Sequence, residues 1–512
     1  MLQDLINEYA STTRTLNLAL LNYFTFVSDQ KVLILGAGMS GITAAKTLIE
    51  AGYHNIQIIE ASDKFGGRIR EASIGNVTVE LGAMWIYGRG SNPIYEMAMD
   101  SNLTMTDSFV DDWTVRDEGG VNLTDAAGVA HTNIKDALHK LSSFSRASKQ
   151  LDGMDLDVMS GIRHFDWLPR TTVDHVIEAY ALDFETGVHP TALSSFNLVI
   201  EQTFEDFGSY DMLAVTDNRG FSTVVKQLCE NILTTNDTRI LLNRTVESIQ
   251  YKDTGVSVLT NSGEVINGDF AIVTFSLGVL QQRQVKFYPP LPKHKQISID
   301  KFGFASYSHI YVQYPYSFWD DTMYLLYASK VRGRFSFWQN MNEVIPGCNI
   351  LQLSLFAEDS RWAERSSDVE ILQIIQDVLQ KMYPNVTIPS PSGHQVSRWN
   401  SDPNFHGAFS YWPAAFTDSD MEALRAPVGR VYFAGEHLHP VHYGFVHGAY
   451  LSGVHAANSL VRCMETNHCD CDSKDTGLFP SSASFVIFGP TILMQKCSFF
   501  FIYCLLIFYI LL

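Results

Sequence analysis

The sequence is short of positive charge. It has 36 Lys or Arg residues against 55 Asp or Glu residues, and its formal net charge at pH 7 is −19. So acidic a surface argues against nucleic acid as the main partner, because phosphate binding requires clustered Lys and Arg. It suits a cationic partner or substrate, although solubility is the simpler reason for net charge taken alone.

Cysteine is also scarce. Seven cysteines in 512 residues are too few and too scattered for a disulfide framework. Cys229 and Cys348 stand alone, and we interpret them as buried thiols. Cys463, Cys469 and Cys471 lie close together late in the chain, where they could form a bridge or bind a metal. Because no neighbouring His or Cys completes a zinc spacing, no metal site is predicted.

The chain lacks internal repeats, and its only low-complexity block is an apolar tail. Apolar residues make up 46% and charged residues 18%, which excludes a disordered, collagen-like or coiled-coil chain. A length of 512 residues predicts about two to four domains.

Both ends of the chain carry apolar segments. Residues 15–27 have the length of a secretory apolar region, but Asp4 and Glu8 precede them where positive charge is usual. We therefore interpret residues 1–28 as an N-terminal extension or a weak signal segment. Residues 466–512 form a linker and an apolar tail, which predicts a removable lipid-anchor signal or a tail anchor.

The tail predicts membrane association and an extracellular or cell-surface location. Six Asn-x-Ser/Thr sequons support secretion weakly, because a chain rich in these residues has several by chance. They lie at Asn76, Asn102, Asn122, Asn236, Asn243 and Asn385.

A strand–helix–strand pattern opens the chain after the N-terminal extension. Residues 31–35 and 56–59 are short apolar runs typical of buried parallel strands, and residues 41–51 between them have helical spacing. Further helices are predicted at 221–233, 369–382 and 449–461, and strands at 239–242, 246–251, 256–260, 270–275 and 431–434.

These pieces predict an α/β fold with two domains. A Rossmann-like nucleotide-binding domain is expected from three separated stretches, 29–95, 215–285 and 395–465. A substrate-binding domain is expected from the insertions, 96–214 and 286–394.

A glycine motif joins the first predicted strand to the first helix. Gly36, Gly38 and Gly41 fit the pattern G-x-G-x-x-G. The first glycine permits a tight turn, the second lets backbone amides approach a pyrophosphate, and the third lets the helix pack close to the sheet. The helix N-terminus then faces the phosphates with unpaired N–H groups. The motif alone is weak, but it has the expected place between strand and helix.

Two further segments extend this nucleotide site. Glu60 ends the second strand, where a carboxylate can accept both ribose hydroxyls. Gly67 and Arg68 follow closely, and Arg68 can offer charge-assisted hydrogen bonds to a pyrophosphate. Gly435 and Glu436 then follow a late strand, before a helix that begins with small residues. This late segment suits a second contact with the same pyrophosphate-ribityl chain, and a nicotinamide dehydrogenase would not need such a distant second half-site.

At these residues the sequence resembles the FAD-dependent amine oxidases, and most closely the plant extracellular polyamine oxidases. The resemblance covers about residues 30 to 465. Its motifs are GAGMSG at 36–41, EASDKFGGR at 60–68, ELGAMW at 80–85, SLGVLQ at 276–281, RAPVGRVYFAGEH at 425–437 and FVHGAYLSG at 445–453.

The resemblance implies an FAD-binding domain and a substrate-binding domain of mixed sheet flanked by helices, with a tunnel that ends at the flavin. It also implies a reaction on polyamines of the spermine and spermidine class. A neutral amine transfers hydride from its α-carbon to flavin N5, the imine hydrolyses, and O₂ reoxidises the flavin and yields hydrogen peroxide. The cofactor carries the redox step, while the protein orients the substrate.

The resemblance assigns roles by position. Contacts with FAD are expected from Glu60, Arg68, Val246 and Glu436. Tunnel residues are expected at Trp85, Tyr180, Phe184 and Glu185, and two aromatic walls beside the flavin at Phe409 and Phe445. Such walls position a linear amine and keep the site dry. Without the resemblance, each of these aromatic residues would be interpreted as core.

Three positions depart from the family pattern. His309 stands where most members have a lysine that holds a water against flavin N5, and an imidazole is titratable near neutral pH. Tyr87 replaces a tunnel carboxylate, which leaves Glu185 as the expected anchor for an ammonium. Phe445 lacks a hydroxyl group. These changes keep two alternatives open: a flavin-binding homologue with lost or altered catalysis, and a flavin oxidoreductase for another substrate, such as a carotenoid-type desaturase.

Overall fold

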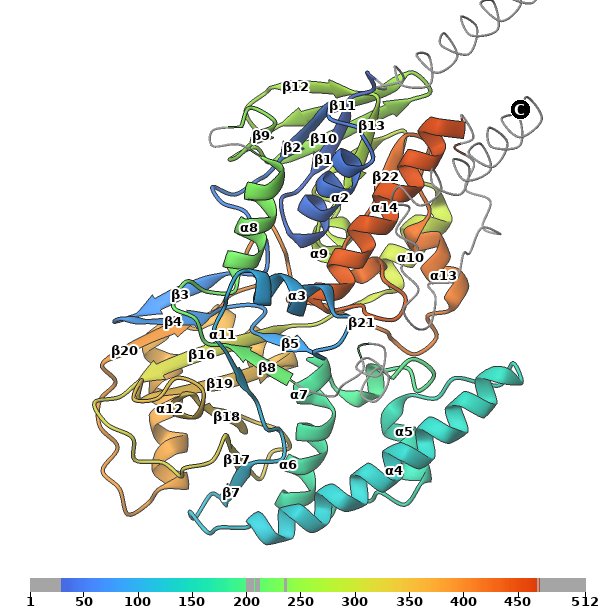
Figure 1. The fold of residues 1–512 in the computed structure, drawn as a ribbon. Helices are drawn as coiled ribbons and strands as arrows, with labels where there is room; N and C mark the ends of the chain where they lie inside the picture. The colour runs from blue at the N-terminus through green and yellow to red at the C-terminus, as the bar shows by residue number, and fades with distance from the viewer. Residues whose placement is uncertain (1–28, 199–206, 208–211, 234–236, 467–468, 470–512) are drawn as a thin grey trace, which may run out of the picture. The chain divides into compact units, whose positions relative to one another are not determined.

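A computed structural model describes residues 29–198, 207, 212–233, 237–466 and 469 (Figure 1). All of them belong to one compact unit of the chain. The predicted signal segment and nearly all of the predicted tail therefore lie outside the described residues. Within the described ranges, no helix combines the length and the apolar character needed to span a membrane.

A parallel sheet lies in the nucleotide-binding part. Its strand order is β22-β13-β1-β2-β9, and every neighbouring pair is parallel. The strands come from the three predicted stretches, as β1 (Val32–Leu35), β2 (Ile56–Ile59), β9 (Ile240–Leu241), β13 (Phe270–Val273) and β22 (Val431–Phe433). Such short, mainly apolar runs are typical of strands covered on both faces. The boundaries of the two domains stay predictions.

Two helices pack on each other beside this sheet, α2 (Met39–Glu50) and α14 (Val446–Thr466) (Figure 1). A Cβ atom at Gly453 would lie 2.3 Å from the Ser40 carbonyl oxygen, so the two backbones approach closely there. Further helices are α3 (Pro93–Asp100), α8 (Ser222–Ile232), α9 (Leu277–Gln281), α10 (Lys293–Lys301) and α13 (Asp418–Arg425). A second sheet, β12-β11-β10-β14, is formed by β10 (Val246–Lys252), β11 (Gly255–Thr260), β12 (Val265–Gly268) and β14 (Lys286–Tyr288).

The substrate-binding part contains a six-stranded mixed sheet of order β20-β16-β19-β18-β17-β7. All its pairs are antiparallel except β17 with β7. Its strands are β7 (Trp113–Asp117), β16 (Tyr307–Gln313), β17 (Tyr324–Ala328), β18 (Phe337–Asn340), β19 (Ile350–Phe356) and β20 (Gly393–Val396). Its helices are α4 (Thr124–Gln150), α5 (Val158–His164), α6 (Thr172–Ala181), α7 (Asp183–Thr186), α11 (Ala357–Arg365) and α12 (Asp368–Met382). The expected mixed sheet with helices is confirmed.

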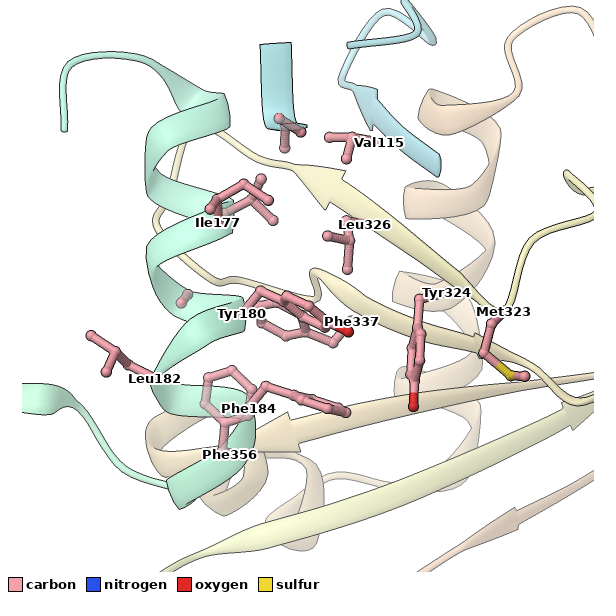
Figure 2. Close-up of a cluster of buried hydrophobic side chains, with 14 of the residues drawn as sticks. Val115, Ile177, Tyr180, Leu182, Phe184, Met323, Tyr324, Leu326, Phe337 and Phe356 are labelled. Carbon is pink, nitrogen blue, oxygen red and sulfur yellow. The ribbon is translucent and has the colours of Figure 1, made fainter. Parts of the chain in front are cut away.

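A cluster of aromatic side chains joins α6 and α7 to this sheet. Figure 2 shows Tyr180 and Phe184 from the helices beside Phe337 and Tyr324 from the strands. Tyr180 stacks on Phe184 with ring centroids 5.4 Å apart, and Phe337 lies 6.1 Å from Tyr180. Because these rings are buried in a continuous core, the positions of Tyr180 and Phe184 are set by packing.

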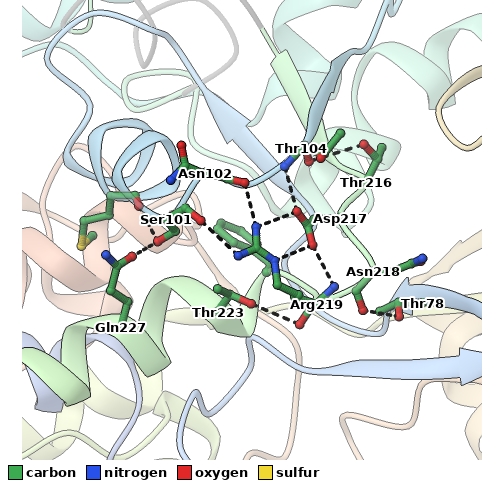
Figure 3. A network of polar contacts seen from close by, with 12 residues as sticks. Thr78, Ser101, Asn102, Thr104, Thr216, Asp217, Asn218, Arg219, Thr223 and Gln227 are labelled. Carbon is green, nitrogen blue, oxygen red and sulfur yellow. Dashed lines mark hydrogen bonds and ion pairs between the residues drawn. The ribbon is translucent and has the colours of Figure 1, made fainter.

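Smaller sheets connect the two parts. They are β3 (Glu71–Ile74) with β4 (Val77–Glu80), β15 (Gly303–Phe304) with β21 (Ser410–Tyr411), and β5 (Trp85–Tyr87) with β8 (Met212–Val215) and β6 (Met105–Asp107). The polar network of Figure 3 lies beside the last of these sheets. Arg219 donates to Asp217 and to the Asn102 carbonyl, and Asp217 accepts from the Thr104 amide. These bonds tie the segment after β8 to the turn before β6.

The described cysteines agree with the sequence interpretation. Cys229 and Cys348 are buried free thiols. Cys463, near the end of α14, forms a disulfide with Cys469. Of the two possibilities for this pair, a bridge or a metal site, the structure therefore has the bridge. Cys471 lies outside the described residues.

Candidate functional site

A cavity of about 730 Å³ runs between the parallel sheet and the mixed sheet. It is lined by every site residue predicted above except Gly41. Segments more than 300 residues apart in the chain thus meet around one space. The cavity has a glycine-lined end at the parallel sheet and an aromatic end at the mixed sheet.

The three glycines of the motif have different roles at the first end. Gly36 has a φ of +122°, and a Cβ atom there would lie 2.3 Å from Thr274 Oγ1. A Cβ atom at Gly41 would lie 2.1 Å from the Gly36 carbonyl oxygen, so Gly41 permits helix packing and does not face the cavity. Gly38 lines the cavity with open space at its Cβ position, where the nearest atom is Gly67 Cα at 3.9 Å.

An anion site follows from this geometry. Gly38 is the N-cap of α2 and offers no side-chain cap, so the first amides of the helix remain available to a ligand. Gly67, with a φ of +60°, brings a second turn against the first, since its Cβ position lies 3.4 Å from Gly38 Cα. Backbone from two turns therefore forms a cradle that side chains would fill, and it fits a pyrophosphate.

Glu60 lies directly after β2 at the same end of the cavity. Its Oε2 accepts from the Ala37 amide at 2.6 Å, and its Oε1 accepts from the Ser62 amide and hydroxyl at 2.8 and 2.6 Å. Three hydrogen bonds thus hold the carboxylate in one orientation. Val246, at the start of β10, lines the cavity beside it. This arrangement fits the expected contact of Glu60 with a ribose and of Val246 with FAD.

Arg68 and Glu436 form an ion pair across the floor of the cavity. Arg68 NH1 donates to Glu436 Oε1 at 2.8 Å and to the Ala408 carbonyl at 2.7 Å. The other oxygen, Oε2, accepts from the Ser410 hydroxyl at 2.5 Å and from the Gly444 amide at 2.7 Å. Burial opposes ionisation of Glu436, but Arg68 and these hydrogen bonds outweigh it and lower its pKa. The pair fixes Arg68 beside the glycine cradle.

His309 lies at the aromatic end, on β16, which pairs with β20 and β19 in the mixed sheet, and its side chain is buried. The Gln352 amide lies 2.5 Å from His309 Nδ1, and Ser354 Oγ lies 3.4 Å away. With Gln352 donating to Nδ1, the proton of the neutral ring is on Nε2. Burial lowers the pKa of His309 to about 4, which corrects the expectation of a group that titrates near neutral pH. Desolvation disfavours the charged imidazolium.

Aromatic rings surround this end. Trp85 from β5 makes edge contacts with His309 and Phe184, with centroid distances of 6.2 and 6.4 Å. Phe409 lies 5.4 Å from Tyr307, and Phe445 lies 5.0 Å from Tyr87. The Trp85 Nε1 donor is buried and has no hydrogen-bond acceptor among the described residues. A polar atom of a bound ligand would satisfy it.

Glu185 is the carboxylate of the aromatic wall. It follows Phe184 in α7 and makes no ion pair or hydrogen bond with the described residues. Its side chain is accessible, but the surface that it exposes faces the cavity. This enclosure raises the pKa of Glu185 to about 7. At its aromatic end the cavity therefore offers a cation the carboxylate of Glu185, which has no counter-ion among the described side chains.

Comparison with known proteins agrees with this geometry. The family model "Flavin containing amine oxidoreductase" matches residues 39–461. Polyamine oxidase 1 of Zea mays is 36% identical over 459 residues, which cover 86% of this chain and 92% of the relative. Polyamine oxidase 7 of Oryza sativa subsp. japonica is 37% identical over 448 residues, covering 83% and 94%.

The chain belongs to the flavin-containing amine oxidoreductases. It is an enzyme of this family, with FAD as cofactor. A solved structure of putrescine oxidase with bound putrescine has a TM-score of 0.68 and 17% identity to this amine oxidase, covering 85% of this chain and 99% of the other. At that identity the likeness supports the fold alone.

The residues present in this amine oxidase fit FAD. The glycine cradle and the α2 N-terminus would hold the pyrophosphate with Arg68, Glu60 would hold the ribose, and the aromatic end would receive the ring system. Gly41 and Thr274 contribute indirectly by permitting the turn. The Thr274 hydroxyl donates to the Leu35 carbonyl, and only the structure showed that this side chain closes the turn.

The departures from the family pattern lie together at the aromatic end. Burial, and then the neighbouring Glu185, raise the pKa of Tyr87 well above its usual range. Tyr87 is therefore a neutral phenol and does not replace the missing charge. Two cavity residues, Asp111 and Lys135, were not predicted from the sequence. Their charges gave no signal, because most charged residues are simply solvated.

Proposed function

We propose that this amine oxidase oxidises linear polyamines of the spermine and spermidine class. The observation that carries the proposal is Glu185, a carboxylate without a counter-ion among the described residues, in an aromatic wall that leads to Trp85 and His309. A chain of methylene groups and ammonium groups needs both apolar walls and a fixed negative charge. The names of the polyamine oxidase relatives from Zea mays and Oryza sativa support this substrate class.

In this proposal the cavity residues have separate roles in substrate binding and catalysis. Glu185 binds an ammonium group, while Phe409 and Phe445 orient the substrate and exclude water. His309 stays neutral, so its Nε2–H donates to a water without adding a positive charge next to the substrate. When bound, FAD supplies the hydride acceptor and passes the electrons to O₂, which becomes hydrogen peroxide.

Anaerobic mixing with spermine or spermidine tests the proposal. We expect the visible absorbance of the oxidised flavin to bleach, and peroxide to appear when air is admitted. A fully acetylated polyamine, which has the same chain but no basic nitrogen, is the control and should leave the spectrum unchanged. Absence of bleaching with every polyamine in a panel would refute the proposal.

A second candidate is a flavin-binding protein with impaired catalysis. It is favoured by the neutral His309, held by Gln352, and by Tyr87, which carries no charge in place of a carboxylate. The double change His309→Lys with Tyr87→Glu should then raise the rate of flavin reduction many-fold. Brisk turnover in the unmodified protein would rule this candidate out. A desaturase for an apolar substrate is not supported, because it predicts a tunnel without a carboxylate such as Glu185.

We also propose an extracellular or cell-surface location. The Cys463–Cys469 disulfide supports it, since such bridges persist in oxidising compartments. The five sequon asparagines within the described residues are all exposed, namely Asn76, Asn102, Asn122, Asn243 and Asn385. Glycosidase treatment of protein from its natural source should lower its mass, and an unchanged mass would contradict this location. Membrane association through the apolar tail stays a prediction.

A further inference from the structure

The outer end of the cavity is charged. Val110 and Asp111, in the loop between β6 and β7, line it together with His131 and Lys135 from α4. The side chains of Asp111 and Lys135 are 61% and 58% exposed. Residues that line the cavity and are also this exposed mark a place where it opens to solvent.

An ion pair spans this opening. Lys135 Nζ lies 3.4 Å from Asp111 Oδ2, and His131 Nδ1 lies 3.7 Å from Asp111 Oδ1. His131 is fixed by an edge contact with Trp113, with ring centroids 5.3 Å apart. The carboxylate is therefore held between an anchored ring and a long, exposed lysine side chain. An exposed pair of this kind contributes only about 0–1 kcal/mol, so another cation can replace Lys135 at little cost.

Continuous contacts connect this opening with the reactive end. His309 contacts Trp85, and Trp85 contacts Phe184. Phe184 stacks on Tyr180, whose hydroxyl donates to the Val110 carbonyl at 2.6 Å. Val110 directly precedes Asp111. The cavity wall thus carries two carboxylates along one path, Glu185 in its middle and Asp111 at its mouth.

We propose that Asp111 is an outer binding site for the far ammonium group of a long substrate, and that this group displaces Lys135 from the carboxylate. This inference rests on the proposed polyamine function and adds a determinant of substrate length. A substrate with charges at several positions can reach Glu185 and Asp111 together. A short diamine that occupies the inner site leaves the Asp111–Lys135 pair intact.

The two members of the pair should have opposite effects. Asp111→Asn removes the outer anchor, so the KM for spermine should rise about three- to fivefold, as expected for an exposed charge pair. Lys135→Gln removes the competing cation, so that KM should fall by about twofold or more. Both variants should leave kcat for spermine and all constants for putrescine unchanged, because neither residue lies at the reactive end.

Asp136→Asn is the matched control. Asp136 neighbours Lys135 on α4, has a 62% exposed side chain and pairs with Lys140, but does not line the cavity. It changes the net charge as Asp111→Asn does, so its kinetic constants should equal those of the unmodified holoenzyme. Flavin content and melting temperature, measured for all three variants, establish that each is folded.

Steady-state peroxide release with spermine and putrescine at fixed ionic strength gives the decision. The inference is overturned if Asp111→Asn and Asp136→Asn have the same KM for spermine. It is also overturned if Asp111→Asn raises the KM for putrescine as much as the KM for spermine, or if Lys135→Gln raises the KM for spermine. If no amine reduces the flavin of the unmodified protein, the proposed function and this inference fail together. If spermine reduces that flavin and the variants have the same KM values as the unmodified protein, only this inference fails.

Discussion

Replacing Glu185 by glutamine tests whether this carboxylate binds a substrate ammonium group. Enclosure in the cavity raises its pKa to about 7, so the carboxylate is the minor form at pH 6 and the major form at pH 8. Only the ionised form attracts a cation. The titration of this one group should therefore lower the polyamine dissociation constant about tenfold between the two pH values.

Glu185→Gln keeps the size of the side chain and removes the titratable charge. The ratio of the variant's dissociation constant to that of the unmodified protein then isolates Glu185 from the ionisation of the substrate. We expect this ratio to rise about tenfold from pH 6 to pH 8. At pH 8 it should reach about 10 to 100, because a hydrogen bond to a charged group contributes about 1.5–3 kcal/mol.

Anaerobic rapid mixing with a series of spermine concentrations measures both dissociation constants, from the concentration dependence of the rate of flavin bleaching at constant ionic strength. A primary monoamine of similar length is the control, since it has no second ammonium group for Glu185 and its ratio should stay near one. A spermine ratio that is the same at pH 6 and pH 8 would refute the reasoning. So would a monoamine that loses as much affinity as spermine.

Three further predictions follow from the buried groups. The apoprotein of Gly38→Ala should have an unchanged melting temperature, but its affinity for FAD should fall about tenfold. Gly41→Ala should lose several kcal/mol of stability, because its Cβ atom would lie 2.1 Å from a carbonyl oxygen. Burial, and then the neighbouring Glu71, raise the pKa of Glu80 to about 8, although the hydrogen bond from the Phe221 amide opposes this shift. The free energy of unfolding should therefore fall by about 3 kcal/mol between pH 4 and pH 7, because the folded state must release a proton that it binds more tightly than the unfolded state does. Denaturant titrations of Glu80→Gln should show no such decline. His309→Gln should leave the pH profile of flavin reduction unchanged above pH 6, since His309 is already neutral there. If the unmodified protein shows an ionisation above pH 6 that is absent from the profile of the variant, the lowered pKa of His309 is contradicted.

The nucleotide end of the site was predictable because its signals are local. The glycine spacing requires a turn whose backbone conformation few other residues adopt, and Gly36 has that conformation. The predicted strands and helices around it appear as β1, α2 and β2, within a few residues of the expected bounds. The reactive end was assigned through resemblance alone. Its aromatic residues have no pattern that distinguishes them from core, and Tyr180 and Phe184 are in fact both cavity wall and core.

The protonation states and ion pairs of the site residues could not be predicted from the sequence. His309 was expected to titrate near neutral pH, but its pKa depends on burial between β19 and Trp85, which lie far from it in sequence. The pair of Asp111 and Lys135 depends on how the loop before β7 meets α4. Neither relation has a sequence signal, because both depend on distances across the fold.

The sequence by itself therefore determined the glycine turn of the nucleotide motif and the α/β class, since both rest on backbone conformation and short-range periodicity. The tertiary structure alone decided which carboxylates meet in one cavity, which of them lack a counter-ion among the described residues, and which ionisable groups stay neutral. The physical reason is that solvation and Coulomb interactions depend on separation in space, and folding sets that separation between residues hundreds of positions apart.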